Sequence, residues 1–200
     1  NQDLNHNRTV ALVGTRKPTE HGKRITEILV ENLKPYNVQI ISGLAYGVDG
    51  ITHKKAVAQN IPNIGVMGNG LDIIYPSDHK DLVKKMINNG GILTEFASGT
   101  KPDKNNFPMR NRIIAAMSDA VIVVESKASG GSIITAEFAN EYNKDVFAIP
   151  GRYNDETSAG CNSLIKRNKA HLIENIDDLL YIMRWDDLDK KKSVQTSLFI

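Results

Sequence analysis

The stretch from residue 120 to residue 124 reads Ala-Val-Ile-Val-Val and indicates the fold class. Its last four residues are a continuous apolar run, which is typical of a β-strand covered on both faces. Next to such runs lie longer amphipathic segments; in residues 20–34, Ile25, Leu29 and Leu33 recur at helical spacing. A strand covered on both faces needs helices on both sides of its sheet. The sequence therefore predicts an α/β protein.

The same alternation continues along the chain and predicts right-handed βαβ units in a mainly parallel, doubly wound sheet. The pattern ends after Met183, so we expect one domain over residues 8–185 and a polar tail over residues 186–200. The expected strands are 9–13, 38–41, 64–66, 91–94, 120–124, 145–148 and 171–173, and the expected helices are 20–34, 48–59, 77–88, 108–118, 132–142 and 177–183.

Composition is typical of a globular protein and argues against disulfide-rich, membrane and secreted classes. The 200 residues are 40% hydrophobic and 24% charged, which is ordinary for a globular domain, and the net charge of +2 is too small to indicate nucleic acid by itself. The single Cys161 excludes an intramolecular disulfide framework and fits a reducing compartment. No apolar stretch has the length of a membrane helix, and the polar N-terminus has no signal-peptide core. We therefore expect a cytoplasmic protein.

Glycines follow four of the expected strands. In a parallel sheet these loops converge on one edge, where backbone N–H groups and helix N-termini favour anions. A single glycine is explained by a tight turn alone, but four such loops predict a phosphate-binding rim. The glycines are Gly14 after the first strand, Gly43, Gly47 and Gly50 after the second, Gly68 and Gly70 after the third, and Gly130 and Gly131 after the fifth.

Familiar catalytic and cofactor motifs are absent from the sequence. There is no P-loop, no G-x-G-x-x-G after the first strand, no G-x-S-x-G and no H-E-x-x-H. We therefore expect neither a nucleotide cofactor nor a metal. Asp49 and His53 are four residues apart on an expected helix; we expect Asp49 to cap that helix and His53 to pack nearby.

Charge is unevenly distributed. Residues 8–24 carry five basic residues against one acidic residue, and residues 101–112 carry four against one. The second segment includes Phe107, and clustered bases with an interleaved aromatic ring indicate a nucleic-acid backbone with a stacked base. The alternative is a solvated basic surface, which we prefer for Lys23 and Arg24. For Arg16, at a strand end beside Gly14, we prefer binding.

Six motifs together resemble the DprA/Smf family of DNA-processing proteins from bacterial natural transformation. The resemblance runs from about residue 8 to residue 183, and the combination is far more specific than any single motif. The motifs are Gly14-Thr15-Arg16-Lys17-Pro18-Thr19; Ser42-Gly43-Leu44-Ala45-Tyr46-Gly47-Val48-Asp49 with His53 and Ala56; Gly68-Asn69-Gly70-Leu71-Asp72 with Tyr75-Pro76; Phe107-Pro108-Met109-Arg110-Asn111-Arg112-Ile113-Ile114-Ala115; Ser129-Gly130-Gly131-Ser132 with Thr135-Ala136; and Gly160-Cys161-Asn162 with Leu164-Ile165.

The resemblance implies an extended Rossmann-like domain that binds single-stranded DNA without sequence preference, protects it and loads the RecA recombinase. It implies no catalytic activity, and it implies a homodimer built around Asn162, Ile165 and Leu172. The family usually also has an N-terminal helical domain and a C-terminal winged-helix-like domain, which these residues do not match. Thr52 departs from the alanine that the family usually has before His53.

The residues and the resemblance together predict the DNA contacts. Arg16 and Lys104 would meet phosphates, and Phe107 would stack on a base. Arg110 and Arg112 cannot both point the same way, so one would meet phosphate and the other would support the loop by pairing with Glu95 or Glu125; a purely structural ion pair of Arg112 is the alternative. The full predicted set is Gly14, Thr15, Arg16, Lys17, Ser42, Gly43, Gly47, Gly68, Lys80, Lys104, Phe107, Arg110, Asn111, Arg112, Gly130 and Ser132.

Three further hypotheses remain open at this point. One is a small enzyme related to LOG-type nucleotide phosphoribohydrolases, although residues 130–137 lack the preceding proline and the Thr–Glu spacing of that motif. Another is a nucleotide-sensing module. The third concerns the tail, where Gln195, Leu198 and Phe199 resemble the pentapeptide that docks on the replicative sliding clamp; the alternative is an apolar latch or an inert end.

Overall fold

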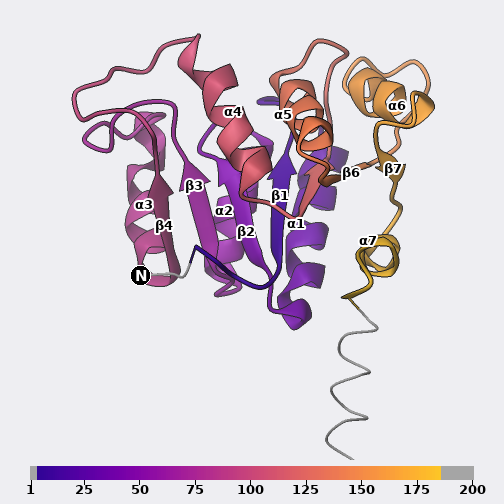
Figure 1. Ribbon diagram of the computed structural model, residues 1–200, viewed down its shortest axis with the longest axis horizontal. Helices are drawn as coiled ribbons and strands as arrows, with labels where there is room; N and C mark the ends of the chain where they lie inside the picture. Colours follow the sequence, from indigo (N-terminus) through magenta and orange to yellow (C-terminus); the bar gives the residue numbers. More distant parts are fainter. Residues whose placement is uncertain (1–3, 186–200) are drawn as a thin grey trace, which may run out of the picture.

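A computed structural model describes residues 4–185 of the chain. They form one seven-stranded sheet in the order β4-β3-β2-β1-β5-β6-β7, and every neighbouring pair is parallel (Figure 1). The predicted α/β fold with a doubly wound, Rossmann-like sheet is confirmed. The strands are β1 (Thr9–Val13), β2 (Gln39–Gly43), β3 (Asn63–Val66), β4 (Gly90–Leu93), β5 (Ala120–Val123), β6 (Asp145–Ala148) and β7 (His171–Leu172).

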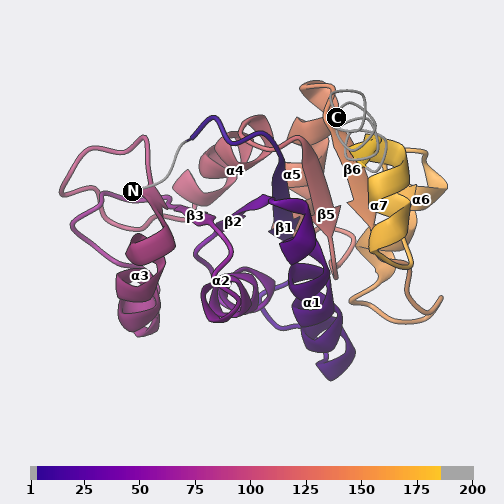
Figure 2. The ribbon, with the colours of Figure 1, turned by 90° about the horizontal axis from the view of Figure 1, so that it is seen from below.

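Helices cover both faces of the sheet, as Figure 2 shows from below. One apolar core joins the sheet to α1, α2 and α7, and a second joins it to α4, α5 and α6. The helices are α1 (Glu20–Leu33), α2 (Val48–Ala58), α3 (Lys80–Met86), α4 (Asn106–Ala116), α5 (Gly131–Glu141), α6 (Ala159–Lys166) and α7 (Ile176–Met183), with short 3₁₀ turns at Lys34–Tyr36, Ser77–His79 and Ile87–Asn89.

Strand β1 shows why a central strand of this sheet carries apolar side chains on both faces. Val10 and Leu12 belong to the first core, while Ala11 and Val13 belong to the second. Successive side chains of a strand point to opposite faces, so a strand between two helical layers has no solvent-facing position. The same reasoning explains the continuous run in β5.

Several expected boundaries need correction. The helix expected over 77–88 is divided, because α3 spans only Lys80–Met86 between two 3₁₀ turns. Helix α6 was not expected at all. Its Gly160 packs against backbone oxygens of Lys127 and Ser126, so this glycine serves close packing and does not mark a loop. Gly47, and not Asp49, is the N-cap of α2.

The carboxyl ends of β1 and β5 form the switch point of the sheet. From β1 the chain passes through α1 to β2 on one side, and β5 pairs with β1 on the other side. The loops after these two strands therefore run in opposite directions and leave a crevice between them, which is where open α/β sheets bind ligands. Among residues 4–185, no helix has the length and apolarity to cross a membrane.

Candidate nucleic-acid interface

A cavity of about 760 Å³ occupies this crevice. The loops after β1 and β5, the segment before α4 and the first turns of α4 and α5 form its walls. This volume lies within the usual range of small-molecule sites, about 300–1,000 Å³. Its lining includes Val13, Gly14, Thr15, Arg16, Lys17, Asp49, Tyr75, Lys104, Phe107, Arg110, Asn111, Ile114, Ser126, Lys127, Gly130, Gly131, Ser132 and Thr135.

Three exposed cations line the mouth of the cavity: Arg16 and Lys17 on the first loop, and Lys104 before α4. Within the described part of the chain, none of them forms an ion pair with a carboxylate. Unpaired cations around a concave surface attract anions, and low-dielectric walls strengthen the field there.

The first loop is held in place by backbone contacts. Val48 N–H donates to Thr15 O at 3.2 Å, and Thr15 N–H donates to Glu125 O at 2.7 Å. Gly47 has φ +76°, and a Cβ at this position would overlap Thr15 and Arg16 backbone atoms. Only glycine allows the second loop to approach the first so closely. The backbone that carries Arg16 is therefore fixed even though its side chain is exposed.

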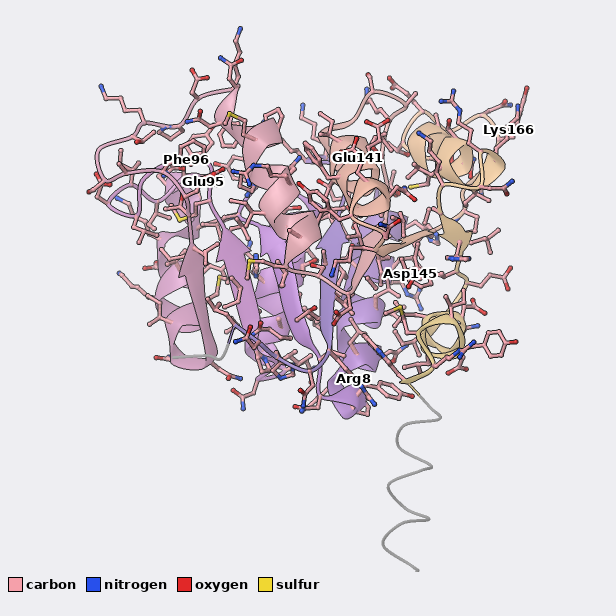
Figure 3. All side chains as sticks on the ribbon, in the orientation of Figure 1. Arg8, Glu95, Phe96, Glu141, Asp145 and Lys166 are labelled. Carbon is pink, nitrogen blue, oxygen red and sulfur yellow. The ribbon has the colours of Figure 1, made fainter. Side chains whose placement is uncertain are left out.

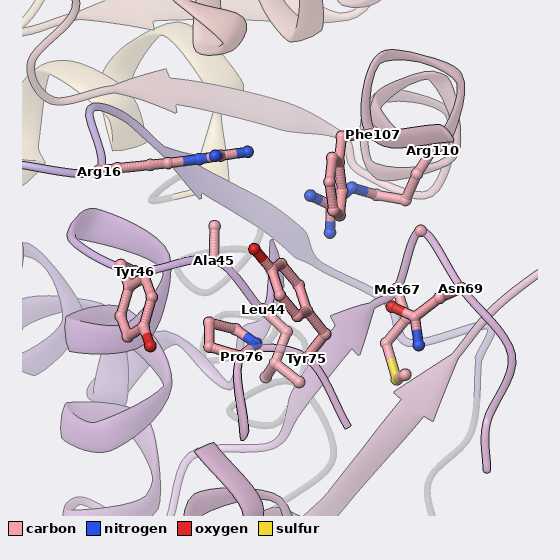
Figure 4. A pocket seen from close by; sticks show the side chains of 11 residues that line it. Arg16, Leu44, Ala45, Tyr46, Met67, Asn69, Tyr75, Pro76, Phe107 and Arg110 are labelled. Carbon is pink, nitrogen blue, oxygen red and sulfur yellow. The ribbon is translucent and has the colours of Figure 1, made fainter. Parts of the chain in front are cut away.

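An aromatic stack lies beside Arg16 (Figure 4). The rings of Tyr75 and Phe107 are stacked with centroids 5.8 Å apart, and Arg16 Cζ lies 5.5 Å from the Phe107 centroid. Gly68, Tyr75 and Phe107 line a small pocket that adjoins the cavity, and a Cβ on Gly68 would come within 2.9 Å of the Phe107 ring. Phe107 is half-buried and Tyr75 is exposed. The site therefore offers an aromatic face next to unpaired cations, which suits a base joined to a phosphate.

Two opposite charges are buried beneath the cavity. Arg110 is 5% exposed; its guanidinium donates to Val66 O and, through Nε at 3.2 Å, to Asn111 Oδ1. Burial raises the pKa of the Asp49 carboxyl, while the positive charge of Arg110 acts in the opposite direction. Burial also lowers the pKa of the Arg110 guanidinium, and here the negative charge of Asp49 opposes it. The two groups thus stabilise each other's charged forms.

The start of α5 forms the inner end of the cavity. Ser132 donates its hydroxyl to Ser126 Oγ at 2.8 Å, and Asn111 Nδ2 donates to Gly131 O at 3.1 Å, which ties α4 to α5. Thr135 lies one turn further along the helix and also lines the cavity. Hydroxyls and the first N–H groups of a helix are donors for an anion.

The structure brings most of the predicted site residues together. Gly14, Thr15, Arg16, Lys17, Lys104, Phe107, Arg110, Asn111, Gly130 and Ser132 all line the cavity, and Gly68 lines the adjoining pocket.

Five predicted residues line neither the cavity nor the adjoining pocket: Ser42, Gly43, Gly47, Lys80 and Arg112. Ser42 is buried and donates its hydroxyl to Leu12 O at 2.6 Å, while Gly43 O lies 2.7 Å from His53 Nε2. Lys80 begins α3 and is exposed to solvent away from the cavity. Ser42 and Gly43 therefore belong to the packing beneath the loop.

Arg110 and Arg112 separate as their spacing predicts. Arg112 forms an ion pair with Glu95, which lies on the segment after β4 near Phe96 (Figure 3). The alternative partner, Glu125, instead accepts from the backbone N–H of Thr19 at 2.9 Å and from its hydroxyl. Arg112 is thus tied to the loop after β4, and Arg110 is the arginine that reaches the cavity.

Residues expected at a dimer surface lie near the β7 edge of the sheet. Leu172, on β7, is 45% exposed. Ile165 packs partly against the second core, and the Asn162 amide exchanges hydrogen bonds with Gly151 N and O at 3.1 and 3.0 Å. The tail residues Gln195, Leu198 and Phe199 lie outside the described residues.

Sequence reasoning did not assign a role to Tyr75, Ser126 or Thr135. Tyr75 and Thr135 lie in two of the six motifs, and this was the only feature of the sequence that pointed to a place in the site. Their contacts come from elements far apart in the chain, since Tyr75 follows β3 and packs on Phe107 of α4.

In the described residues, no group of three or more His, Cys, Asp and Glu forms a metal site. Burial raises the pKa of the Cys161 thiol to about 12.

The fold and site define a Rossmann-like protein with a cationic, aromatic-lined cavity at its switch point. The chain belongs to the DNA recombination-mediator protein A family, whose model matches residues 1–184. It is 43% identical to Protein Smf of a Synechocystis species, over 86% of this chain and 43% of the relative. This chain spans about half the length of the curated relatives that it matches.

Two solved structures share the fold at substantial sequence identity. DNA processing protein A from Streptococcus pneumoniae matches with a TM-score of 0.81 and 39% identity, over 89% of this chain and 62% of that chain. DNA processing protein A from Helicobacter pylori matches with a TM-score of 0.83 and 34% identity, over 92% of this chain and 83% of that chain. The latter structure is described as revealing a single-stranded DNA binding mode.

Proposed function

We propose that this domain binds single-stranded DNA without sequence preference and performs no chemical step on it. The observation that carries the proposal is the arrangement of Arg16, Lys17 and Lys104, unpaired with carboxylates, around the stacked rings of Phe107 and Tyr75. The single-stranded DNA binding mode described for the Helicobacter pylori relative supports it.

Single strands fit this site better than a duplex. An aromatic side chain reaches the face of a base only where that base is unstacked, and every base offers such a face. Cations that meet phosphates add affinity but carry no sequence information. The combination predicts binding that depends on strandedness and salt and is almost independent of sequence.

The lining of the cavity also favours binding over catalysis. Glu137 is the acid that the phosphoribohydrolase hypothesis requires; it is exposed on α5 and is not among the cavity's lining residues. The deep carboxylate, Asp49, is held beside Arg110. A nucleoside monophosphate incubated with the protein should therefore release no free base.

The wider role proposed here follows from the family. Domains of this kind would protect an incoming strand and load a RecA recombinase on it during natural transformation, acting as a homodimer that includes Leu172 and Ile165 on its surface. Clamp docking by Gln195, Leu198 and Phe199 stays a separate prediction. A peptide of residues 193–200, with a Leu198→Ala, Phe199→Ala control, tests it by titration against the clamp.

The binding proposal is tested with charge variants of the cavity mouth. Arg16→Gln and Lys104→Gln should each weaken binding of a fluorescent, 5′-hydroxyl oligonucleotide about three- to tenfold for every sequence tried, because each removes one phosphate contact. Lys84→Gln is the control, since Lys84 is exposed, pairs with Asp81 at 3.1 Å and lies on α3. Equal affinities of all four proteins would refute the proposed site.

A further inference from the structure

Thr135 is a buried residue at the inner end of the cavity, and its hydroxyl has no hydrogen-bond partner in the described chain. The residue is 1% exposed and lines the cavity, and within residues 4–185 its hydroxyl forms no hydrogen bond. By contrast, Thr26 in α1 donates its hydroxyl to Gly22 O at 2.7 Å. A hydroxyl that has no protein partner and borders a cavity is a donor available to a ligand.

The direction of the helix aims this donor toward the cavity's anion-binding end. Side chains of a helix tilt toward its N-terminus, and residues four apart lie on the same face, so the Thr135 side chain leans toward Gly131. A Cβ placed on Gly131 would meet no atom within 4 Å, so the space in front of this first turn is open. Helix α5 has 11 residues, and the partial positive charge of its N-terminus faces the same space.

The charges around this end favour an anion. Arg16, Lys17 and Lys104 line the same cavity without carboxylate partners in the described chain. Of the other charged groups in the lining, Lys127 pairs with Glu156 at 2.7 Å and Asp49 is held beside Arg110. No carboxylate of the cavity lining therefore pairs with the cations at the mouth.

The unpaired cations around the cavity favour the end of a chain. Val13, Ile114 and Thr135 are buried residues that line its inner part, and β1, α4 and α5 stand behind them. A terminal phosphate carries more negative charge than the phosphodiester of an internal linkage, so these cations attract it more strongly.

We propose that the inner end of this cavity binds a phosphate monoester through the Thr135 hydroxyl and the first turn of α5. Its two possible sources are a free mononucleotide and the phosphorylated end of a DNA strand. The inference goes beyond strand binding at the mouth of the cavity and does not require it, because a mononucleotide fits the cavity alone.

The first experiment separates the two sources by calorimetric titration. One arm uses deoxythymidine 5′-monophosphate and thymidine; the other uses short oligonucleotides that differ only in a 5′-phosphate, a 3′-phosphate or hydroxyl ends. Tighter binding of the monophosphate than of thymidine, by tenfold or more, identifies a nucleotide site. A similar preference only among oligonucleotides identifies a strand end. Absence of both preferences, or equal binding of thymidine and its monophosphate, would overturn the inference.

Matched variants then assign the site to Thr135. Thr135→Val keeps the shape but removes the donor, so it should abolish the preference for phosphate, a loss of about ten- to a hundredfold, while Thr135→Ser should retain it. Thr52→Val is the control, because the Thr52 hydroxyl has no partner either, is buried and does not line the cavity. If Thr135→Val folds normally by circular dichroism and keeps the preference, the assignment is wrong.

Binding of the hydroxyl-ended oligonucleotide distinguishes this inference from the proposed function. Thr135→Val should lose the preference for phosphate, whereas Arg16→Gln should lower the affinity for every oligonucleotide. Loss of the phosphate preference with intact strand binding supports the inference. Weak strand binding by the wild type, with a clear preference for the monophosphate, would refute the proposed function and leave the inference standing.

Discussion

Gly43 lies between the two buried charges beneath the cavity. A Cβ there would overlap the Asp49 carboxylate and would lie 2.6 Å from Arg110 Nη1. Gly43→Ala should therefore lower the free energy of unfolding by roughly 3 kcal/mol or more, because it must push apart two largely buried charges.

Gly131 supplies the control for this prediction. A Cβ there meets no atom within 4 Å, so Gly131→Ala should change stability by less than about 1 kcal/mol. Urea denaturation measures both variants. Equal, small effects would mean that Asp49 and Arg110 are not held as closely as the structure indicates.

His53 makes stability depend on pH. Its Nδ1 lies 3.0 Å from Asn63 Oδ1 and its Nε2 lies 2.7 Å from Gly43 O, yet burial dominates and lowers its pKa to about 4. The unfolded chain, with an ordinary histidine pKa near 6.5, binds this proton first as the pH falls. The stability contributed by neutral His53 is therefore present above pH 6.5 and is lost as the pH falls toward 4.

A difference measurement isolates this effect from the titration of Asp49. The stability advantage of the wild type over His53→Gln should shrink by roughly 3 kcal/mol between pH 7 and pH 4. His21→Gln is the control, because His21 is exposed on α1. A constant difference between wild type and His53→Gln across this range would contradict the assigned burial effect.

At the residue scale, local spacing predicted how neighbouring side chains diverge but not which distant residues meet. The spacing of Arg110 and Arg112 predicts that they diverge, and they do. Nothing local to Tyr75 indicates that it packs on Phe107, because that contact requires the loops after β3 and before α4 to meet. Asp49 resembles a cap in sequence, but its burial beside Arg110 depends on the packing of α4 over β2 and β3.

At the element scale, periodicity located every strand and all helices but α6. Strands β1 and β6 have the expected bounds because apolar runs with clear polar ends define them. Helix α6 was missed because Gly160 resembles a loop residue, and its close approach to the Ser126 and Lys127 backbone is visible only in three dimensions.

The edge strand β7 carries the prediction about assembly. Leu172 is 45% exposed at this edge, so Leu172→Glu should yield a stable monomer if the proposed dimer includes this surface. Leu71→Glu is the control, because Leu71 is 52% exposed and follows β3 at the other side of the sheet. Light scattering after gel filtration measures the mass of each protein. A monomeric wild type, or a Leu172→Glu variant that remains dimeric, would contradict the prediction.

At the scale of the whole molecule, the sequence predicts convergence of the glycine loops but not which loops share one cavity. Strand order determines that. With β1 between β2 and β5, the loops after β1 and β5 border the crevice, while Lys80 on α3 is left outside it. A groove with five cations, including Lys80 and Arg110, was the expectation; three exposed cations without a carboxylate partner, Arg16, Lys17 and Lys104, line the observed cavity.

This count determines the expected salt dependence. Each phosphate neutralised on a single strand contributes about −0.7 to the slope of log K against log salt, so contacts from Arg16, Lys17 and Lys104 predict a slope of roughly −2. Each charge variant should reduce the slope by about one third. Phe107 and Tyr75 add a stacking contribution that salt does not screen.

The most direct test of strand binding is the affinity of the wild-type protein for single-stranded and double-stranded DNA of the same sequence across a salt series. The account predicts clearly tighter binding of the single strand at every salt concentration, with a slope of roughly −2 that does not change with sequence. Equal affinity for the duplex, or a slope near zero, would contradict it.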